Sequence, residues 1–216
     1  MPASSPLVGI LIGSQSDWPK VRAAAEALEE FGIAYEVRVA SAHRTPDLVR
    51  EYAVAAAERG LQVILAAAGG AAHLAGAAAA HTILPVVGIP VPTELAGGLD
   101  SLLSTLQMPG DVPVATVAVG GGGPRNAGLL AAEILALADP SLRQKLLAFK
   151  RSLAEKVVAK NAAFQRSLPS PSGRGTHEWV PGGEGARQPA LAPSPRRAIT
   201  RRRSGGGGGD KAGPSP

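Results

Sequence analysis

A hydroxyl, an imidazole and a guanidinium lie within four residues of one another, at Ser41, His43 and Arg44. Histidine is the side chain best suited to general acid–base catalysis near neutral pH. The planar fork of an arginine binds phosphate through two parallel hydrogen bonds. The segment therefore predicts proton transfer on a phosphorylated ligand. The alternative for the arginine is a surface ion pair with Asp47 or Glu51.

A second polar segment, Gly-Ser-Gln-Ser-Asp, follows the apolar run 7–12. Gly13 would allow a tight turn, and Ser14 and Ser16 offer hydroxyls beside the unpaired N–H groups of a helix start, a combination typical of anion-binding sites. Asp17 would repel a phosphate, so we expect it to cap the helix or to bind a sugar hydroxyl. A capping turn without any ligand is the alternative for the whole segment.

A second imidazole, His73, follows Gly69 and Gly70, whose lack of side chains lets a ligand approach the backbone. With the first imidazole it forms a pair of candidate catalytic groups. Metal binding is disfavoured, because the chain has no cysteine and no acidic third ligand at a suitable spacing. His81 lies in an alanine run and His177 in the C-terminal part, and we assign neither a function. We therefore expect a site without a metal.

Nucleotide cofactors are also disfavoured. The glycines at 120–123 precede a helical pattern, but the phosphate-loop pattern GxxxxGK[ST] is absent. No GxGxxG pattern follows the first apolar run either. Nucleoside triphosphate and NAD chemistry are therefore disfavoured.

The three polar segments each follow a strand-like run, and helical patterns separate these runs. We predict strands at 7–12, 35–40, 62–67, 85–89 and 114–119, and helices at 18–31, 46–59, 71–80, 99–107, 126–138 and 141–164. This alternation predicts an α/β fold with a parallel five-stranded sheet between two layers of helices. Ligands of such sheets bind at the carboxyl ends of the strands, where the polar segments fall.

Composition divides the chain into one domain at 1–165, with a sheet core at about 7–138, and a tail at 166–216. The tail is rich in Gly and Pro and carries a net charge of +6, whereas the remainder carries −1, so we expect disorder in the tail and no nucleic-acid surface on the domain. The helix at 141–164 has an apolar stripe that covers either its own domain or a neighbouring subunit.

The N-terminus lacks the charged segment of a secretory signal, and no run of about 18 apolar residues is present. We therefore expect a cytoplasmic protein without a membrane span.

Four segments, 13–18, 41–46, 68–74 and 100–109, occur in an order that resembles the bacterial N5-carboxyaminoimidazole ribonucleotide mutases of purine biosynthesis. The resemblance extends over about 7–165. It implies a flavodoxin-like three-layer α/β/α domain, a homo-octamer with an extra C-terminal helix that reaches a neighbour, and no metal or other cofactor. It also implies a functional link to the ATP-dependent synthetase that makes the substrate.

The reaction implied by the resemblance moves a carboxylate from the exocyclic nitrogen of the imidazole ribonucleotide to a ring carbon. The resemblance assigns His43 as the general acid–base and Asp17 to the ribose hydroxyls. It assigns the 5′-phosphate to Ser14, Ser41 and Arg44, beside the hydroxyl of Ser16. The pocket that retains carbon dioxide would be lined by Ala68, Gly69, Gly70, His73 and Leu74. Ala67 and Ala75 depart from the Gly and Pro that are usual in this pattern.

Two other functions are compatible with these residues. One is direct carboxylation of aminoimidazole ribonucleotide by carbon dioxide, although the SAHRTP and AAHL segments resemble the mutases better. The other is a non-catalytic module that binds a phosphorylated metabolite. A pure binder would need neither His43 nor His73 as a proton donor, which disfavours it.

Overall fold

The computed structural model describes residues 5–168. The chain divides into one unit at Met1–Ser167 and a second at Leu168–Pro216, and the fold below is that of the first unit. The disorder expected for the tail falls almost entirely outside the described residues.

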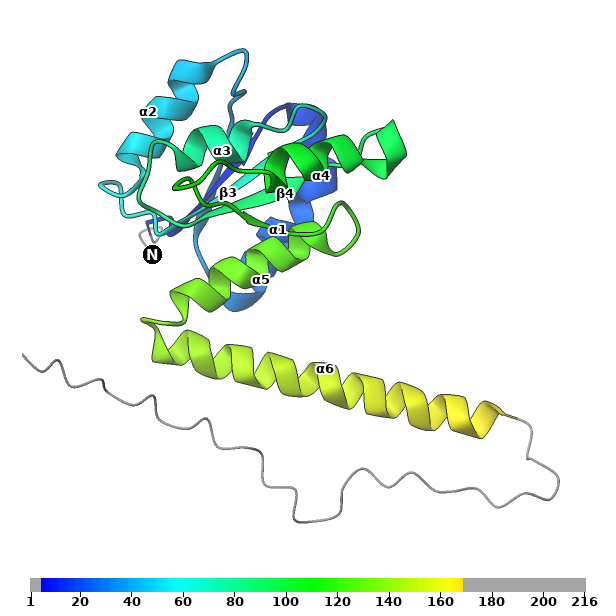
Figure 1. The fold of residues 1–216 in the computed structure, drawn as a ribbon. Coiled ribbons are helices and arrows are strands. Elements are labelled where there is room, and N and C mark those ends of the chain that lie inside the picture. The colour runs from blue at the N-terminus through cyan, green and yellow to red at the C-terminus, as the bar shows by residue number, and fades with distance from the viewer. Residues whose placement is uncertain (1–4, 169–216) are drawn as a thin grey trace, which may run out of the picture. The chain divides into compact units, whose positions relative to one another are not determined.

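A five-stranded parallel sheet forms the middle layer (Figure 1). Its strands are β1 (Val8–Ile12), β2 (Tyr35–Val39), β3 (Val63–Ala68), β4 (Val86–Pro90) and β5 (Ala115–Thr116). The spatial order is β2-β1-β3-β4-β5, the arrangement of flavodoxin-like domains. Strands β1, β3 and β4 are buried almost throughout, as continuous apolar runs predict, while the edge strand β2 is partly exposed. The predicted fold class is confirmed.

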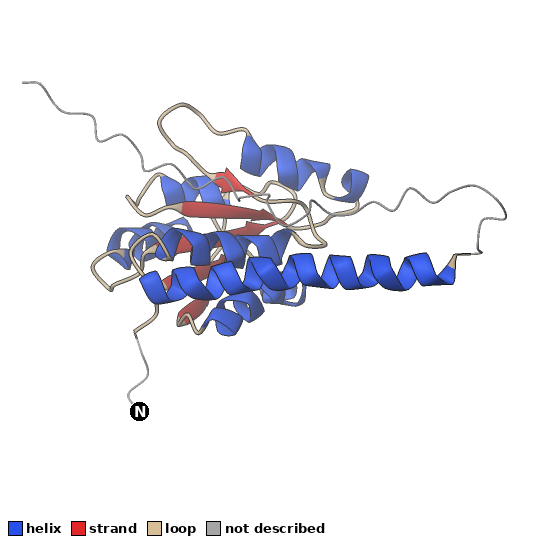
Figure 2. Ribbon diagram, turned by 90° about the horizontal axis from the view of Figure 1, so that it is seen from below, coloured by secondary structure: helices blue, strands red, loops and turns tan. Residues whose placement is uncertain are grey.

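Helices cover both faces of the sheet (Figures 1 and 2). On one face, α1 (Trp18–Phe31) and α5 (Gly123–Leu135) close one hydrophobic core with β1, β3 and β4. On the other face lie α2 (Pro46–Ala56), α3 (Leu74–Ala79) and α4 (Leu99–Leu106), with a second core under α2 and α3. Short 3-10 turns at Gln15–Asp17 (η1) and Leu95–Gly97 (η2) precede α1 and α4.

The last helix, α6 (Pro140–Ser167), is tied to the domain by its first turns. Leu142 and Leu146 are buried, and Lys145 donates from Nζ to the carbonyl of Phe31 at the end of α1, 2.9 Å away. Arg143 donates to the carbonyls of Ala136 and Leu137, which directly follow α5. Residues 153–168 are all exposed. The helix therefore covers its own domain only near its start.

Several predicted boundaries move. Strand β5 has two residues instead of six, and the chain turns shortly after it at Gly120 and Gly121, both with positive φ. Helix α3 begins at Leu74 instead of 71, since residues 70–73 form tight turns in which the N–H groups of Ala72 and His73 donate to the carbonyls of Gly70 and Ala71. Helix α5 begins earlier than predicted, with Pro124 in its first turn, and α6 continues to Ser167.

In the described part of the chain, none of the helices has the length and apolar character needed to cross a membrane.

Candidate active site

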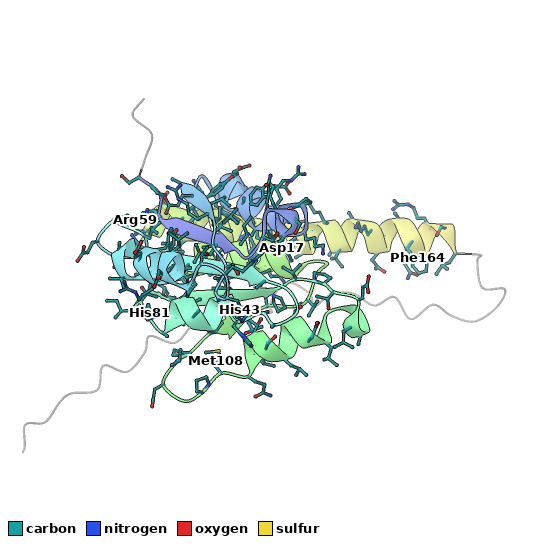
Figure 3. All side chains as sticks on the ribbon, turned by 90° about the horizontal axis from the view of Figure 1, so that it is seen from above. Asp17, His43, Arg59, His81, Met108 and Phe164 are labelled. Carbon is teal, nitrogen blue, oxygen red and sulfur yellow. The ribbon has the colours of Figure 1, made fainter. Side chains whose placement is uncertain are left out.

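A cavity of about 640 Å³ opens at the carboxyl edge of the sheet. Most of the residues predicted to bind a ligand line it: Gly13, Ser14, Asp17, Ser41, His43, Arg44, Ala68, Gly69, Gly70 and Leu74. Asp17 and His43 reach it from the ends of different strands (Figure 3). Parallel strands bring these distant segments together because all of their carboxyl ends meet at one edge. Ser16 and His73 are not among the lining residues.

The first polar segment forms a small hydroxyl cluster. Ser14 caps η1, its Oγ accepting from the N–H of Ser16 at 3.3 Å, and the two hydroxyl oxygens lie 2.8 Å apart. Ser16 therefore supports Ser14 from outside the cavity. Gly13 does not have the positive φ that a glycine-specific turn would require, so its expected role in a tight turn is not needed. Its carbonyl instead accepts from Arg44.

Asp17 does not cap α1, because its side chain makes no capping hydrogen bond. Its carboxyl lines the cavity instead. Burial raises the pKa of this carboxyl above its ordinary value, against the opposing charges of Lys20 and Arg44 and a backbone hydrogen bond at Ser14. A partly buried carboxylate at this position is an acceptor for ligand hydroxyls.

Arg44 bridges the ends of two neighbouring strands. Its Nη2 donates to the carbonyl of Gly13 at 3.2 Å, and its backbone N–H donates to the Oγ of Ser41 at 3.3 Å. Among the described residues no carboxylate lies within ion-pair distance of this guanidinium, so the alternative of a surface pair with Asp47 or Glu51 is wrong. The guanidinium is therefore the cationic group that Ser41 and the end of β1 hold at the cavity.

Thr45 shapes the same segment in an unexpected way. It stands at the N-cap position of α2, but its hydroxyl makes no capping bond. The hydroxyl accepts from the N–H of Ser41 at 2.9 Å and donates to the carbonyl of Ser41 at 3.2 Å. These two hydrogen bonds to the backbone of Ser41 fix the loop that carries Ser41, His43 and Arg44.

The two predicted imidazoles contact each other directly. Nε2 of His43 lies 2.8 Å from Nδ1 of His73, and the rings meet edge to face with centroids 5.0 Å apart. His43 lines the cavity, whereas His73, at the N-cap of α3, is not one of the lining residues. One of the two nitrogens must carry the shared proton, so each ring constrains the tautomer of the other.

Four lining residues lie outside the predicted polar segments: Lys20, Val91, Pro92 and Thr93. Lys20 Nζ donates to the carbonyl of Pro92 at 3.3 Å, and Thr93 donates to Asp100 at 2.6 Å, a hydrogen bond that lowers the pKa of Asp100. Both groups had a signal in the sequence. Residues 91–93 follow the fourth strand, to which the strand-end rule applies equally, and Lys20 lies three residues after Asp17 on the same helix face.

Within residues 5–168 no group of three or more His, Cys, Asp or Glu is placed to hold a metal ion. Ala67 and Ala75, the two departures from the expected pattern, are both buried. Ala67 is regularly paired in β3 with Ile12 and Ile89 on the neighbouring strands, so the small change leaves the strand undistorted.

Residues 7–156 match the family described as AIR carboxylase. The chain belongs to the AIR carboxylase family. The N5-carboxyaminoimidazole ribonucleotide mutase of Mycobacterium tuberculosis (strain H37Rv) is 59% identical over 161 residues, which are 74% of this chain and 91% of that protein. The mutase of Vibrio cholerae is 54% identical over 151 residues, 70% of this chain and 94% of the other.

A solved structure gives the same grouping. The crystal structure of Treponema denticola PurE superimposes with a TM-score of 0.65 at 31% identity, covering 73% of this chain and 98% of that one. The match extends over nearly the whole of that protein, so the family fold accounts for most of the first unit.

Proposed function

We infer that this chain is an N5-carboxyaminoimidazole ribonucleotide mutase of purine biosynthesis. The observation that carries this inference is the identity of 53–59% to mutases from several bacteria, each covered over nine-tenths or so of its length. The cavity adds independent support, because it combines phosphate-binding groups, a carboxylate and an imidazole at one edge of the sheet. The enzyme is an isomerase that moves a carboxylate within one molecule.

For substrate binding we propose that Ser14, Ser41 and Arg44 hold the 5′-phosphate. Hydroxyls and a guanidinium that lacks a carboxylate partner in the described chain form a suitable set of donors. Asp17, in its carboxylate form, accepts from the ribose hydroxyls. Ser16 acts indirectly, by orienting Ser14.

For the chemical steps we propose His43 as the acid and base. As the bond between the exocyclic nitrogen and the carboxylate breaks, His43 protonates the nitrogen and carbon dioxide is released into the pocket. The ring carbon then attacks carbon dioxide, and His43 takes the proton that this carbon loses, so the proton balance is zero. The contact with His73 engages Nε2 of His43 and leaves Nδ1 for exchange with the substrate.

The walls of the pocket retain carbon dioxide between these steps. Ala68, Gly69, Gly70 and Leu74 line one side of the cavity and offer no polar side chain to a neutral gas. Escape of carbon dioxide would leave the ring without its second reactant, so exclusion of water and closure of this side favour rearrangement over loss.

Assembly as a homo-octamer is a further part of the proposal. The apolar stripe of α6, buried at Leu142 and Leu146, continues past the domain as Leu153, Val157 and Phe164, which are 41%, 67% and 59% exposed. Phe164 projects from the part of the helix farthest from the sheet (Figure 3). A neighbouring subunit would cover this stripe. We also propose a cytoplasmic location and supply of the substrate by an ATP-dependent synthetase.

The test uses two substrates side by side with the full chain. One is N5-carboxyaminoimidazole ribonucleotide without added bicarbonate, and the other is aminoimidazole ribonucleotide with high bicarbonate. We expect turnover mainly of the first. Preference for the second at low bicarbonate would instead make the chain a direct carboxylase, and binding without turnover of either would make it a phosphometabolite-binding module.

A further inference from the structure

Two polar side chains of the described chain are fully buried among apolar neighbours, and both belong to α4. Ser101 is 0% exposed and Thr105 is 2% exposed, one helical turn apart on the same face. A hydroxyl removed from water costs free energy unless it finds hydrogen-bond partners. The partners of these hydroxyls therefore indicate what the face of α4 does.

The partners lie in the loop between β3 and α3, about 30 residues earlier in the chain. Ser101 Oγ accepts from the N–H of Gly70 at 2.9 Å. On the adjacent turn, Ser104 Oγ accepts from the N–H of Ala72 at 3.1 Å and lies 2.9 Å from the carbonyl of Gly70, although its shortest bond is to the carbonyl of Asp100 within α4, 2.5 Å away. Thr105 Oγ1 lies 3.5 Å from the carbonyl of Ala72, its stronger bond being to the carbonyl of Ser101 within the helix.

Within itself this loop is bonded by two turns, in which the N–H groups of Ala72 and His73 donate to the carbonyls of Gly70 and Ala71 at 2.8 and 2.9 Å. Its residues are Gly69, Gly70, Ala71 and Ala72, which have no side chains long enough to anchor it, and Gly70 has a positive φ of 70°. Only the backbone can be held, and the hydroxyls of Ser101 and Ser104 on α4 hold it. Three of the loop residues line the cavity, and the loop ends at His73, which contacts His43.

We propose that Ser101 and Ser104 are positioning residues that set the distance of this loop from the imidazole ring of the bound substrate. The inference rests on the proposed mutase function. A loop held close retains carbon dioxide beside the ring carbon until the new carbon–carbon bond forms. A loop that is released lets carbon dioxide leave, after which the reaction ends at aminoimidazole ribonucleotide. The hydroxyls touch neither the substrate nor the proton, so they act on the outcome of the reaction through the loop.

The experiment measures two products from N5-carboxyaminoimidazole ribonucleotide: the rearranged carboxylate and aminoimidazole ribonucleotide. A blank without enzyme is subtracted for spontaneous decarboxylation. In Ser101→Ala and Ser104→Ala we expect the fraction lost as aminoimidazole ribonucleotide to rise by about fivefold or more, with KM changed by less than about twofold, because phosphate and ribose contacts are untouched.

Two further variants separate positioning from stability. Ser104→Thr keeps the hydroxyl at a half-buried position and should restore the product ratio of the unaltered chain. Ser152→Ala removes a comparable hydroxyl bond to a backbone carbonyl within α6 and should not move the ratio. An unchanged ratio in both Ser101→Ala and Ser104→Ala would overturn the proposal, as would failure of Ser104→Thr to restore it.

A different readout keeps the proposal testable if the mutase function itself fails. Should the unaltered chain convert neither substrate, amide hydrogen exchange at Gly70 and Ala72 is compared between it and Ser104→Ala. Faster exchange in the variant supports positioning of the loop by α4, and equal exchange overturns it. Because Ser104 is only half-buried, this variant retains its fold even if Ser101→Ala does not.

Discussion

The contact between His43 and His73 is the central feature at the scale of single residues. Nε2 and Nδ1 are 2.8 Å apart, so the pair shares one proton and orients the ring that lines the cavity. Asp17 is the other group whose protonation matters, since burial raises the pKa of its carboxyl. Each of these features gives a kinetic prediction.

Replacement of His43 by Asn removes the proposed proton donor and acceptor. We expect kcat to fall by roughly 10²–10⁴-fold, the usual contribution of general acid–base catalysis. Substrate affinity, measured by calorimetry, should change little because the phosphate and ribose groups remain. His81→Asn is the matched control, since His81 is exposed and outside the cavity, and it should keep full activity. Full turnover by His43→Asn would sink the assigned role.

The raised pKa of the Asp17 carboxyl leads us to expect that substrate binding depends on pH. Because burial raises its pKa, Asp17 takes up a proton at a higher pH than an ordinary aspartate as the solution is acidified. The neutral carboxyl accepts hydrogen bonds poorly, so KM should rise on the acid side of neutrality. The stability of the fold responds to pH in the opposite direction to substrate binding. The stabilising contribution of this raised pKa is fully present below the pKa of Asp17 in the unfolded chain, and it is lost as pH rises through the pKa in the folded protein.

The measurement is a profile of KM against pH for the unaltered chain and for Asp17→Asn. Asp17→Asn should have a higher KM than the unaltered chain at neutral pH, and its KM should no longer rise as the pH is lowered below neutrality. If the limb persists unchanged in Asp17→Asn, another group causes it.

At the scale of elements, the tightest contact between helices joins α1 and α5. Gly128 of α5 lies against the carbonyl of Ala24 and the methyl group of Ala27 on α1, so closely that a Cβ at position 128 would overlap the carbonyl and lie 2.9 Å from the methyl carbon. Both partners belong to backbone or to short side chains and cannot move aside. The position of α1, which carries Asp17 at its start, therefore depends on this glycine.

Gly128→Ala should destabilise the fold. We expect a loss of about 1–3 kcal/mol in the free energy of unfolding, the usual cost of overpacking a close contact. Chemical denaturation monitored by circular dichroism measures it. Gly122→Ala is the control: its φ is ordinary, and among the described residues no atom lies within 4 Å of an added Cβ. Equal midpoints for the two variants would contradict the account of the helix contact.

At the scale of the whole molecule, α6 has an apolar surface that its own domain covers only in part. Its stripe runs from the buried Leu142 to the exposed Val157, and Phe164 lies two turns further on. An apolar stripe of this length is stable in water only beside a partner. The proposed octamer supplies that partner.

Val157→Lys should therefore reduce the assembly to smaller species, measured as mass by light scattering after size-exclusion chromatography. Glu155→Lys introduces the same side chain on the opposite face of the helix and should leave the mass unchanged. Deletion of 169–216, which removes only residues after α6, should also leave mass and turnover unchanged. A Val157→Lys protein with the mass of the unaltered chain would contradict an interface on this stripe.

The amino-acid sequence was sufficient to predict the α/β alternation, the five parallel strands and the polar residues at their carboxyl ends. These features depend on local periodicity and on the general geometry of parallel sheets. The bounds of α1 were predicted to the residue, because Pro19 and Gly32 mark its two ends. Local preference was misleading at Thr45, which stands at the N-cap position of α2 but bonds through its hydroxyl to Ser41, four residues earlier, and makes no capping bond.

Only the tertiary structure decided which side chains meet. The pairing of His43 with His73, the approach of Lys20 to Pro92 and the bonds from Ser101 and Ser104 to their loop join residues 30 or more positions apart. No local pattern encodes such contacts, because they depend on the order of strands and on how each helix lies over the sheet. The sequence by itself determined what chemistry the strand ends could carry. The packing of α3 and α4 decided how that chemistry is arranged and which backbone groups hold it in place.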